Sequence, residues 1–445
     1  MNPTPSTSPH PAAPDRRRLG LWSAVALVVA NMIGTGVFTT SGFALQDLKS
    51  RELVLLAWLV GGVVAMAGAL SYGALARRMP ESGGEYFFLS RTVHPLAGFL
   101  AGWVSLLAGF TAPIAAAALG LQAYLCPLFG EGLQPEWIAT GSIAVAALMH
   151  GLRSSRGVAL QNLAVALKVV LIGGLVCLGA ARIGAPEVAP LAVDDFPLSA
   201  FSVSLVWISF AYSGWNAAVY VGGEIRDSER NLSRSLWLAT AAVTVLYLAL
   251  NAVFLYAAPM DALAGRAEVG AIAAEALGGT RLRNAVSILV ALALFTAISS
   301  MVMIGPRVYA RMAEDGQFPR ILSTRGETPG AAVALQAVLA VAVVWLSGLR
   351  ELLGLIGFTL GLSAAATVIS LIALRQREGA GRVPVPGYPW LPALFVAATL
   401  CSSAFLVVRA PDEALKGLLI VLTGVPLYFV LRKTPGAGDA RERSA

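Results

Sequence analysis

Twelve apolar stretches follow one another along this chain, and most of them are long enough to cross a bilayer. A helix needs about 20 apolar residues to span the hydrocarbon core. The 445 residues are 57% hydrophobic and 13% charged, whereas soluble domains are about a quarter charged. We therefore predict an all-α integral membrane protein with 12 transmembrane helices, at residues 20–43, 53–76, 96–124, 137–152, 158–181, 200–222, 236–257, 284–305, 331–349, 351–374, 392–409 and 414–431.

The distribution of basic residues predicts the orientation of these helices. With the N-terminus inside, cytoplasmic tails and loops hold 22 of the 32 Lys and Arg residues and external loops hold nine. Loops rich in Lys and Arg stay on the cytoplasmic side. We expect a multi-pass protein of a bacterial inner (plasma) membrane with both termini cytoplasmic, including tails at 1–18 (disordered) and 433–445. Because the charge is not clustered on one domain, we expect no nucleic-acid partner.

The first predicted span is interrupted by Gly34-Thr35-Gly36. Interrupted helices are tolerated at membrane depth where they line a cavity, and they point to the substrate site of transporters. The second half-helix would offer free amides and a positive dipole end to a carboxylate. The first half-helix would offer free carbonyls to an ammonium group. Close helix packing is the alternative explanation of paired glycines.

A second interruption occurs in the sixth predicted span, at Phe210-Ala211-Tyr212-Ser213-Gly214-Trp215-Asn216. Each interruption falls in the first helix of a block of five, and an odd number of crossings gives the second block inverted topology. This pattern is typical of inverted-repeat transporters. We predict one transporter domain over 19–432, with repeats at 19–181 and 200–374 and two extra helices over 392–431. Phe210 and Trp215 are candidate gates, although they could also be ordinary packing aromatics.

Lys168 is the only ionisable residue well inside a predicted span. Charges within the membrane are costly and are functional candidates, although a long side chain can also reach the interface. Lys168 is predicted to couple protons to transport or to act as a fixed cation between helices. Ser299 and Ser300, in the eighth predicted span, are its candidate hydrogen-bond partners.

Three charged segments are predicted to be solvated cytoplasmic loops whose carboxylates pair with Arg residues: 77–86, 224–232 and 307–316. The histidines and the three cysteines lack the spacing of a metal or nucleophile site. A phosphate-binding loop that ends in Lys-Ser/Thr is also absent from the sequence. We expect no enzymatic activity, no metal and no cofactor.

Four motifs together resemble the APC (amino acid–polyamine–organocation) superfamily, closest to the L-type transporters and their bacterial relatives, over residues 19–432. They are Gly34-Thr35-Gly36-Val37-Phe38, Pro80-Glu81-Ser82-Gly83-Gly84-Glu85-Tyr86, the 210–216 stretch with Glu224 and Asn231, and Arg307–Gly316 with Pro319.

The resemblance implies a LeuT-type fold of five plus five inverted helices with two more appended, alternating access and an amino-acid substrate. Lys168 matches a fifth-span lysine that occupies the second sodium site of sodium-coupled relatives, which favours sodium-independent proton symport or exchange. Ser213 stands where the family usually has a glycine. It adds a side chain near the substrate, so the resemblance does not predict the size of the pocket. The implied substrate-binding residues are Met32, Ile33, Gly34, Thr35, Gly36, Phe210, Ala211, Ser213 and Gly214, with Phe210 as the gating aromatic.

The site-forming spans carry no charged partner for a charged substrate side chain except at their ends, and burying an unpaired charge is costly. Neutral L-amino acids are therefore the expected substrates, with Ser105, Leu106 and Phe110 shaping the side-chain pocket. A transporter of cationic amino acids or polyamines, or a nutrient sensor that does not transport, is the alternative. The amino acid transported, any partner subunit and the oligomeric state stay open.

Overall fold

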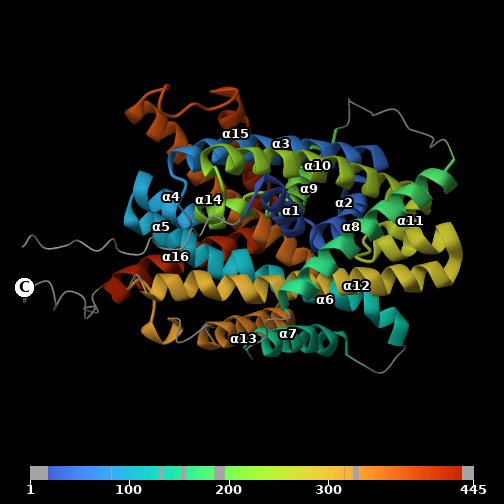
Figure 1. Ribbon diagram of the computed structural model, residues 1–445. Helices are drawn as coiled ribbons and strands as arrows, with labels where there is room; N and C mark the ends of the chain where they lie inside the picture. Colours follow the sequence, from blue (N-terminus) through green and yellow to red (C-terminus); the bar gives the residue numbers. More distant parts are fainter. Residues whose placement is uncertain are drawn as a thin grey trace, which may run out of the picture.

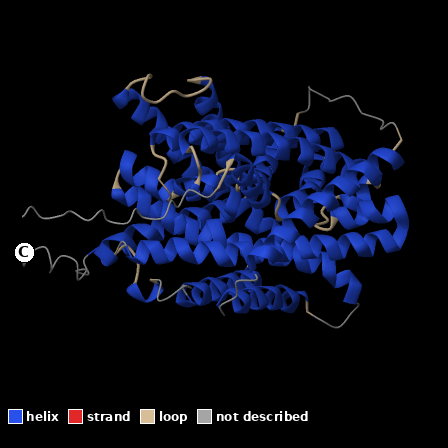
Figure 2. Cartoon of the chain, viewed as in Figure 1, coloured by secondary structure: helices blue, strands red, loops and turns tan. Residues whose placement is uncertain are grey.

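The computed structural model describes residues 19–81, 83–129, 134–151, 157–184, 196–314, 316–323 and 330–432. The described chain is helical almost throughout, and its only extended pairing is an isolated bridge between Leu19 and Ile225 (Figure 2). The predicted tails, Ser82 and Asp315 lie outside the described residues.

The helices of the first half begin and end close to the predicted spans. Two spans are interrupted, and a π-helical segment (η1) lies within the third. The elements are α1 (Leu21–Met32), α2 (Thr35–Leu48), α3 (Arg51–Arg78), α4 (Gly84–Thr92), α5 (Pro95–Val104), η1 (Ser105–Thr111), α6 (Ala112–Phe129), α7 (Pro135–Gly151), α8 (Gly157–Arg182), α9 (Leu198–Tyr212) and the 3-10 helix η2 (Ala217–Glu224).

The second half contains the longest helix of the described chain, α12, which is kinked at Gly278 and Gly279. Two short helical turns, α11 and η3, lie in the connections on either side of it. The elements are α10 (Ser228–Ala257), α11 (Met260–Leu263), α12 (Val269–Glu314), η3 (Arg320–Leu322), α13 (Gly330–Leu346), α14 (Leu349–Glu378), α15 (Trp390–Arg409) and α16 (Pro411–Arg432).

Eight helices in the described part of the chain are long and apolar enough to cross a membrane, or up to nine if the bent pair α1 and α2 forms one span. The axes of α1 and α2 differ by 42°. The prediction of an all-helical membrane protein is confirmed. The count of twelve crossings and the inverted repeat stay predictions.

The interrupted helices lie at the centre of the bundle. In Figure 1, α1 and α9 are drawn between α3 and α10 on one side and α6 and α12 on the other, with α7 and α13 at the outer edge. Among these helices, α10 packs against α1, and α3 packs against α9. The buried core runs continuously through these helices and includes Trp58, Tyr72, Tyr212 and Tyr247. The centre of the bundle is therefore shielded by complete helices.

All three segments predicted to be solvated loops are helical in part; in the segment 224–232, α10 begins at Ser228 and Leu232 is buried. Arg307–Glu314 continues α12 without a break, and Tyr309 and Met312 on this extension are buried. Glu85 lies in the first turn of α4 and is 6% exposed. The prediction of solvated loops was wrong at these helical residues, because apolar residues among the charged ones pack against the bundle. Glu81, between α3 and α4, is exposed as predicted.

Candidate functional site

The first interruption separates α1 from α2 at Ile33 and Gly34. Gly34 is extended, with φ −130° and ψ −153°, and no side chain caps the N-terminus of α2. The predicted interruption is confirmed, but Thr35 and Gly36 already belong to the first turn of α2. The uncapped amides at this turn can donate hydrogen bonds to an anionic group, as at other helix N-termini.

The second interruption follows Tyr212, where α9 ends. Ser213 is extended, and Gly214 has φ +94°, a conformation that glycine adopts without strain. The chain resumes as η2 at Ala217. The predicted break in the sixth span is therefore present, and it leaves carbonyl groups at the end of α9 without helical partners.

The two interruptions touch each other. A Cβ atom added to Gly214 would lie 2.8 Å from the carbonyl oxygen of Asn31, and one added to Gly36 would lie 2.4 Å from Cα of Ala211. Both glycines are required for this close approach. Gly36 thus serves helix packing, whereas Gly34 has open space around it and marks the break itself.

Side chains from other helices hold the carbonyls at the end of α1. The hydroxyl of Tyr247, on α10, donates to Met32 O at 2.5 Å and to Ala211 O at 3.2 Å. The ammonium of Lys168, on α8, donates to Ile33 O at 3.2 Å and is 2% exposed. Lys168 therefore contacts the interruption directly.

The serines predicted to bind Lys168 lie on α12. Ser299 hydrogen-bonds to His150 Nε2, at the end of α7, at 2.7 Å. Within the described residues neither Ser299 nor Ser300 hydrogen-bonds to Lys168. The predicted pairing was wrong, because the lysine turns toward the backbone of the broken helix instead.

A cavity of about 620 Å³ lies beside the second interruption, at the scale of ligand-binding pockets. Of the nine predicted substrate-binding residues, Phe210, Ser213 and Gly214 line it, and the other six do not: Met32, Ile33, Gly34, Thr35, Gly36 and Ala211. Ser105 and Phe110 also line the cavity, whereas Leu106 is buried away from it. Asn31 lines it next to the first break.

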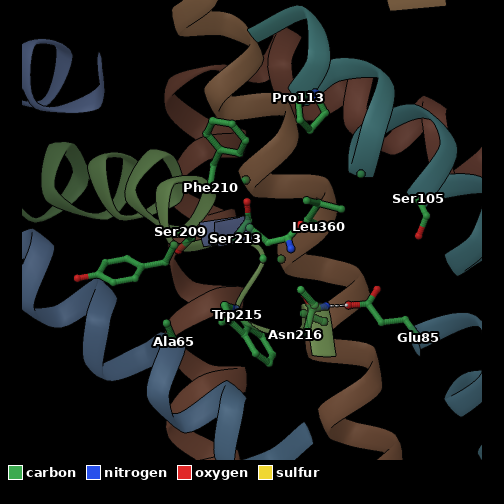
Figure 3. A pocket seen from close by; sticks show the side chains of 18 of the residues that line it. Ala65, Glu85, Ser105, Pro113, Ser209, Phe210, Ser213, Trp215, Asn216 and Leu360 are labelled. Carbon is green, nitrogen blue, oxygen red and sulfur yellow. Dashed lines mark hydrogen bonds between the residues drawn. The ribbon is translucent and has the colours of Figure 1, made fainter. Parts of the chain in front are cut away.

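The two candidate gate aromatics line the cavity from different directions. Phe210 lies toward Pro113 of α6 in Figure 3, with Ser213 between it and Trp215. Trp215 packs edge-on against Tyr72, with ring centroids 4.7 Å apart, and also against Phe395, at 6.1 Å. Trp215 is thus wedged between α3 and α15, whereas Phe210 borders the open space.

Glu85 brings a buried carboxylate to the cavity wall (Figure 3). Tyr72 and Ser363 each donate a hydrogen bond to it at 2.7 Å, and the amide of Asn216 donates at 3.3 Å. Burial raises the pKa of Glu85 above its ordinary value, while these three hydrogen bonds oppose that shift. The expected pairing with an Arg residue was wrong here: Glu85 ties α4 to α3, η2 and α14 through neutral donors.

The cavity reaches the end of the bundle that is predicted to be cytoplasmic. Among the described residues that line it, the charged ones, Glu85, Glu224 and Arg307, lie at that end. At the opposite end, Arg350 donates to both carboxylate oxygens of Asp47 at 2.7 Å, joining α2 to α14. Its guanidinium also lies 4.8 Å from the centre of the Trp207 ring.

Sequence reasoning missed Tyr247 and Glu85. Tyr247 and Asn251 are polar residues one helical turn apart in a mostly apolar span. This pair could have indicated a polar contact within the bundle. Glu85 was set aside because charged residues between spans are usually solvated. Within the described residues, no group of three or more His, Cys, Asp or Glu side chains could hold a metal ion.

Comparisons with known proteins agree with this architecture. Residues 19–430 match the family described as "Amino acid permease". The chain is 28% identical to "Large neutral amino acids transporter small subunit 2" of Rattus norvegicus over 93% of this chain and 80% of that protein. It is 26% identical to "Serine/threonine exchanger SteT" of Bacillus subtilis over 94% and 97%. "Asc-type amino acid transporter 1" of Mus musculus is 28% identical over 93% and 81%. With the family matched over nearly its whole length, the chain belongs to the amino acid permeases of the APC superfamily.

Proposed function

We propose that this protein is a secondary active transporter that moves neutral L-amino acids across the membrane by alternating access. The observation that carries the proposal is the contact between the two interrupted helices, where Gly214 lies against Asn31. The uncapped amides at the start of α2 and the carbonyls at the end of α9 suit the carboxylate and the ammonium of one amino acid.

The distribution of charge supports a neutral substrate. Among the described residues that line the cavity, the charged ones are Glu85, Glu224 and Arg307. The carboxylate of Glu85 is already hydrogen-bonded to three donors. A cationic or acidic side chain of a substrate held at Ser213 would therefore lose water without gaining a free counter-charge beside it.

The position of Lys168 supports sodium independence. Its ammonium supplies a positive charge to the carbonyl of Ile33, at the place where sodium-coupled relatives are expected to bind their ion. A second cation beside it would be repelled. One relative is named a transporter of large neutral amino acids and another a serine/threonine exchanger. The second name favours exchange over proton symport for this chain.

The paired interruptions also support the proposed topology: twelve crossings, inverted repeats over 19–181 and 200–374, and extra helices over 392–431. We place both termini in the cytoplasm of a bacterial cell. With that orientation, the Arg350–Asp47 pair closes the external side while the cavity reaches the cytoplasmic side. The structure then corresponds to an inward-facing state.

The test is uptake by purified protein in proteoliposomes. We expect labelled neutral amino acids to enter only when the vesicles contain an amino acid, and to do so equally in sodium and in potassium buffer. Uptake driven by a pH gradient into empty vesicles would instead assign symport. A sodium requirement, or arginine or a polyamine as the best competitor, would contradict the proposal, and binding without flux would assign a sensor.

A further inference from the structure

The cavity has a branch that the site-forming spans do not account for. Besides α9 and α14, it is lined by Gly61, Val64 and Ala65 of α3 and by residues of α15. In Figure 3, Ser209 and Ala65 lie on one side of Ser213, whereas Ser105 and Glu85 lie on the other. We define the branch by the lining residues of α3 and α15 together with Ser209: Gly61, Val64, Ala65, Ser209, Phe395, Ala398, Thr399, Ser402 and Ser403.

Complete helices surround this branch. The helix α15 packs against α3, α9 and α14, and Phe395 on α15 contacts the ring of Trp215. Ser209 nevertheless has an exposed side chain in the last turn of α9. Because α9 is covered by α2, α3, α14 and α15, that exposed surface faces the cavity.

Hydroxyl groups without a hydrogen-bond partner occur at several places in the described helices, including Thr40, Thr111 and Ser204, but those of the branch also line the cavity. Hydroxyls in neighbouring spans, such as those of Ser71, Thr240 and Thr359, donate to the carbonyl one turn back. Within the described part of the chain, Ser209, Thr399, Ser402 and Ser403 make no hydrogen bond. Ser402 and Ser403 are 7% and 6% exposed, so two nearly buried, unpartnered hydroxyls line the branch.

Unpaired hydroxyl groups at membrane depth are costly unless a ligand or water pairs with them. Because the branch contains no charged residue, a neutral polar group is the partner that fits it. Ser209 lies one helical turn, about 6 Å along the axis, from Ser213 at the interruption. A side chain that leaves a substrate held at Ser213 can therefore enter the branch.

We propose that this branch receives the substrate side chain, and that its four hydroxyls select neutral amino acids that carry a hydroxyl or an amide. This proposal rests on the proposed function. It assigns the side-chain pocket to α3 and α15, on the opposite side of Ser213 from the pocket expected at Ser105 and Phe110. Thr399 is a specificity-determining residue in this arrangement.

The test compares threonine with valine. The two side chains have the same shape, but threonine has a hydroxyl group where valine has a methyl group. Competition against labelled alanine in proteoliposomes gives the ratio of their inhibition constants. We expect the unmodified protein to favour threonine. Thr399→Val, and Ser402→Ala combined with Ser403→Ala, should each reduce this preference about two- to tenfold, the effect of one neutral hydrogen bond.

Two matched controls separate recognition from general damage. Cys401→Ala changes an exposed residue of α15 that does not line the cavity, and Ser204→Ala removes a buried hydroxyl of α9 that does not line it either. Both should keep the preference for threonine. Ala398→Leu should fill the branch, weakening glutamine and threonine at least fivefold while alanine still enters.

The outcomes distinguish the two proposals. The α15 variants could keep both alanine transport and the ratio of the inhibition constants for threonine and valine. That result would overturn the proposed role of the branch and leave the transporter proposal standing. No alanine transport by the unmodified protein would overturn both.

Discussion

The ammonium group of Lys168 lies 3.2 Å from the carbonyl oxygen of Ile33, the residue at which the first membrane helix breaks. A carbonyl freed from its helix needs a partner inside the bilayer, and Lys168 supplies it from α8. The same contact places a fixed positive charge next to the end of α1. Lys168 thereby links a residue of the fifth predicted span to the proposed substrate site.

Replacing Lys168 by Met should therefore weaken amino-acid exchange strongly. The change leaves the carbonyl of Ile33 unsatisfied and removes a charge-assisted hydrogen bond, which is worth about 1.5–3 kcal/mol. We expect exchange to fall about 10- to 100-fold, measured as initial rates in proteoliposomes. The exposed Lys49, replaced by Asn, is the control and should retain full activity. Exchange that survives in Lys168→Met while pH-driven uptake is lost would make Lys168 a proton-coupling group instead.

Thr35 tests the proposed carboxylate site. Its side chain is 4% exposed, and its methyl group packs against Gly120 of α6. Thr35→Val keeps this packing and removes only the hydroxyl, so substrate affinity should weaken by about 1.5–3 kcal/mol, or roughly 10- to 100-fold. Thr39→Val is the matched control, because Thr39 is also buried in α2 and its hydroxyl bonds to Thr35 O. Equal affinities of the two variants, measured by equilibrium binding, would refute the role of Thr35.

The pair of Arg350 and Asp47 tests the proposed external closure. Both side chains are partly exposed, so we expect a coupling of about 0.2–1 kcal/mol. Asp47→Asn and Arg350→Gln should each speed hydrogen exchange in the last turn of α2, measured by mass spectrometry. The double variant should be no faster than the single variants, because the same interaction is already lost. Additive effects would show that the two residues act separately.

The sequence predicted both interruptions because glycines and a hydroxyl inside an apolar span weaken a helix at known positions. It did not separate Gly34, which marks the break, from Gly36, which packs against Ala211. That distinction depends on which helix lies opposite each residue. Membership of the permease family confirms the expectation that the chain is not an enzyme.

Other features depend on contacts that no local pattern contains. The cap that Tyr247 provides for Met32 joins residues 215 positions apart. The helical extension at Arg307 was hidden because charged residues were assumed to leave the bundle. The branch along α15 was missed since only five spans were expected to form the site. All three features depend on packing between residues that are far apart in the sequence.

Glu85 is expected to make stability depend on pH. Burial raises its pKa above the ordinary value of 4.5, so the folded protein binds this proton more tightly than the unfolded chain does. The free energy of unfolding should therefore increase as the pH falls through the raised pKa, and this increase should level off below about 4.5. Above the raised pKa the cost of the buried charge is fully present.

Glu85→Gln removes that charge while keeping a side chain that can pair with Ser363 and Tyr72. Its thermal stability in detergent should exceed that of the unmodified protein at neutral pH and should change less as the pH is lowered toward 4.5. Glu81→Gln, an exposed position in the same segment, is the control and should follow the unmodified curve. A Glu85→Gln curve that runs parallel to the unmodified one would contradict the prediction, because the proton taken up on acidification would then belong to another group.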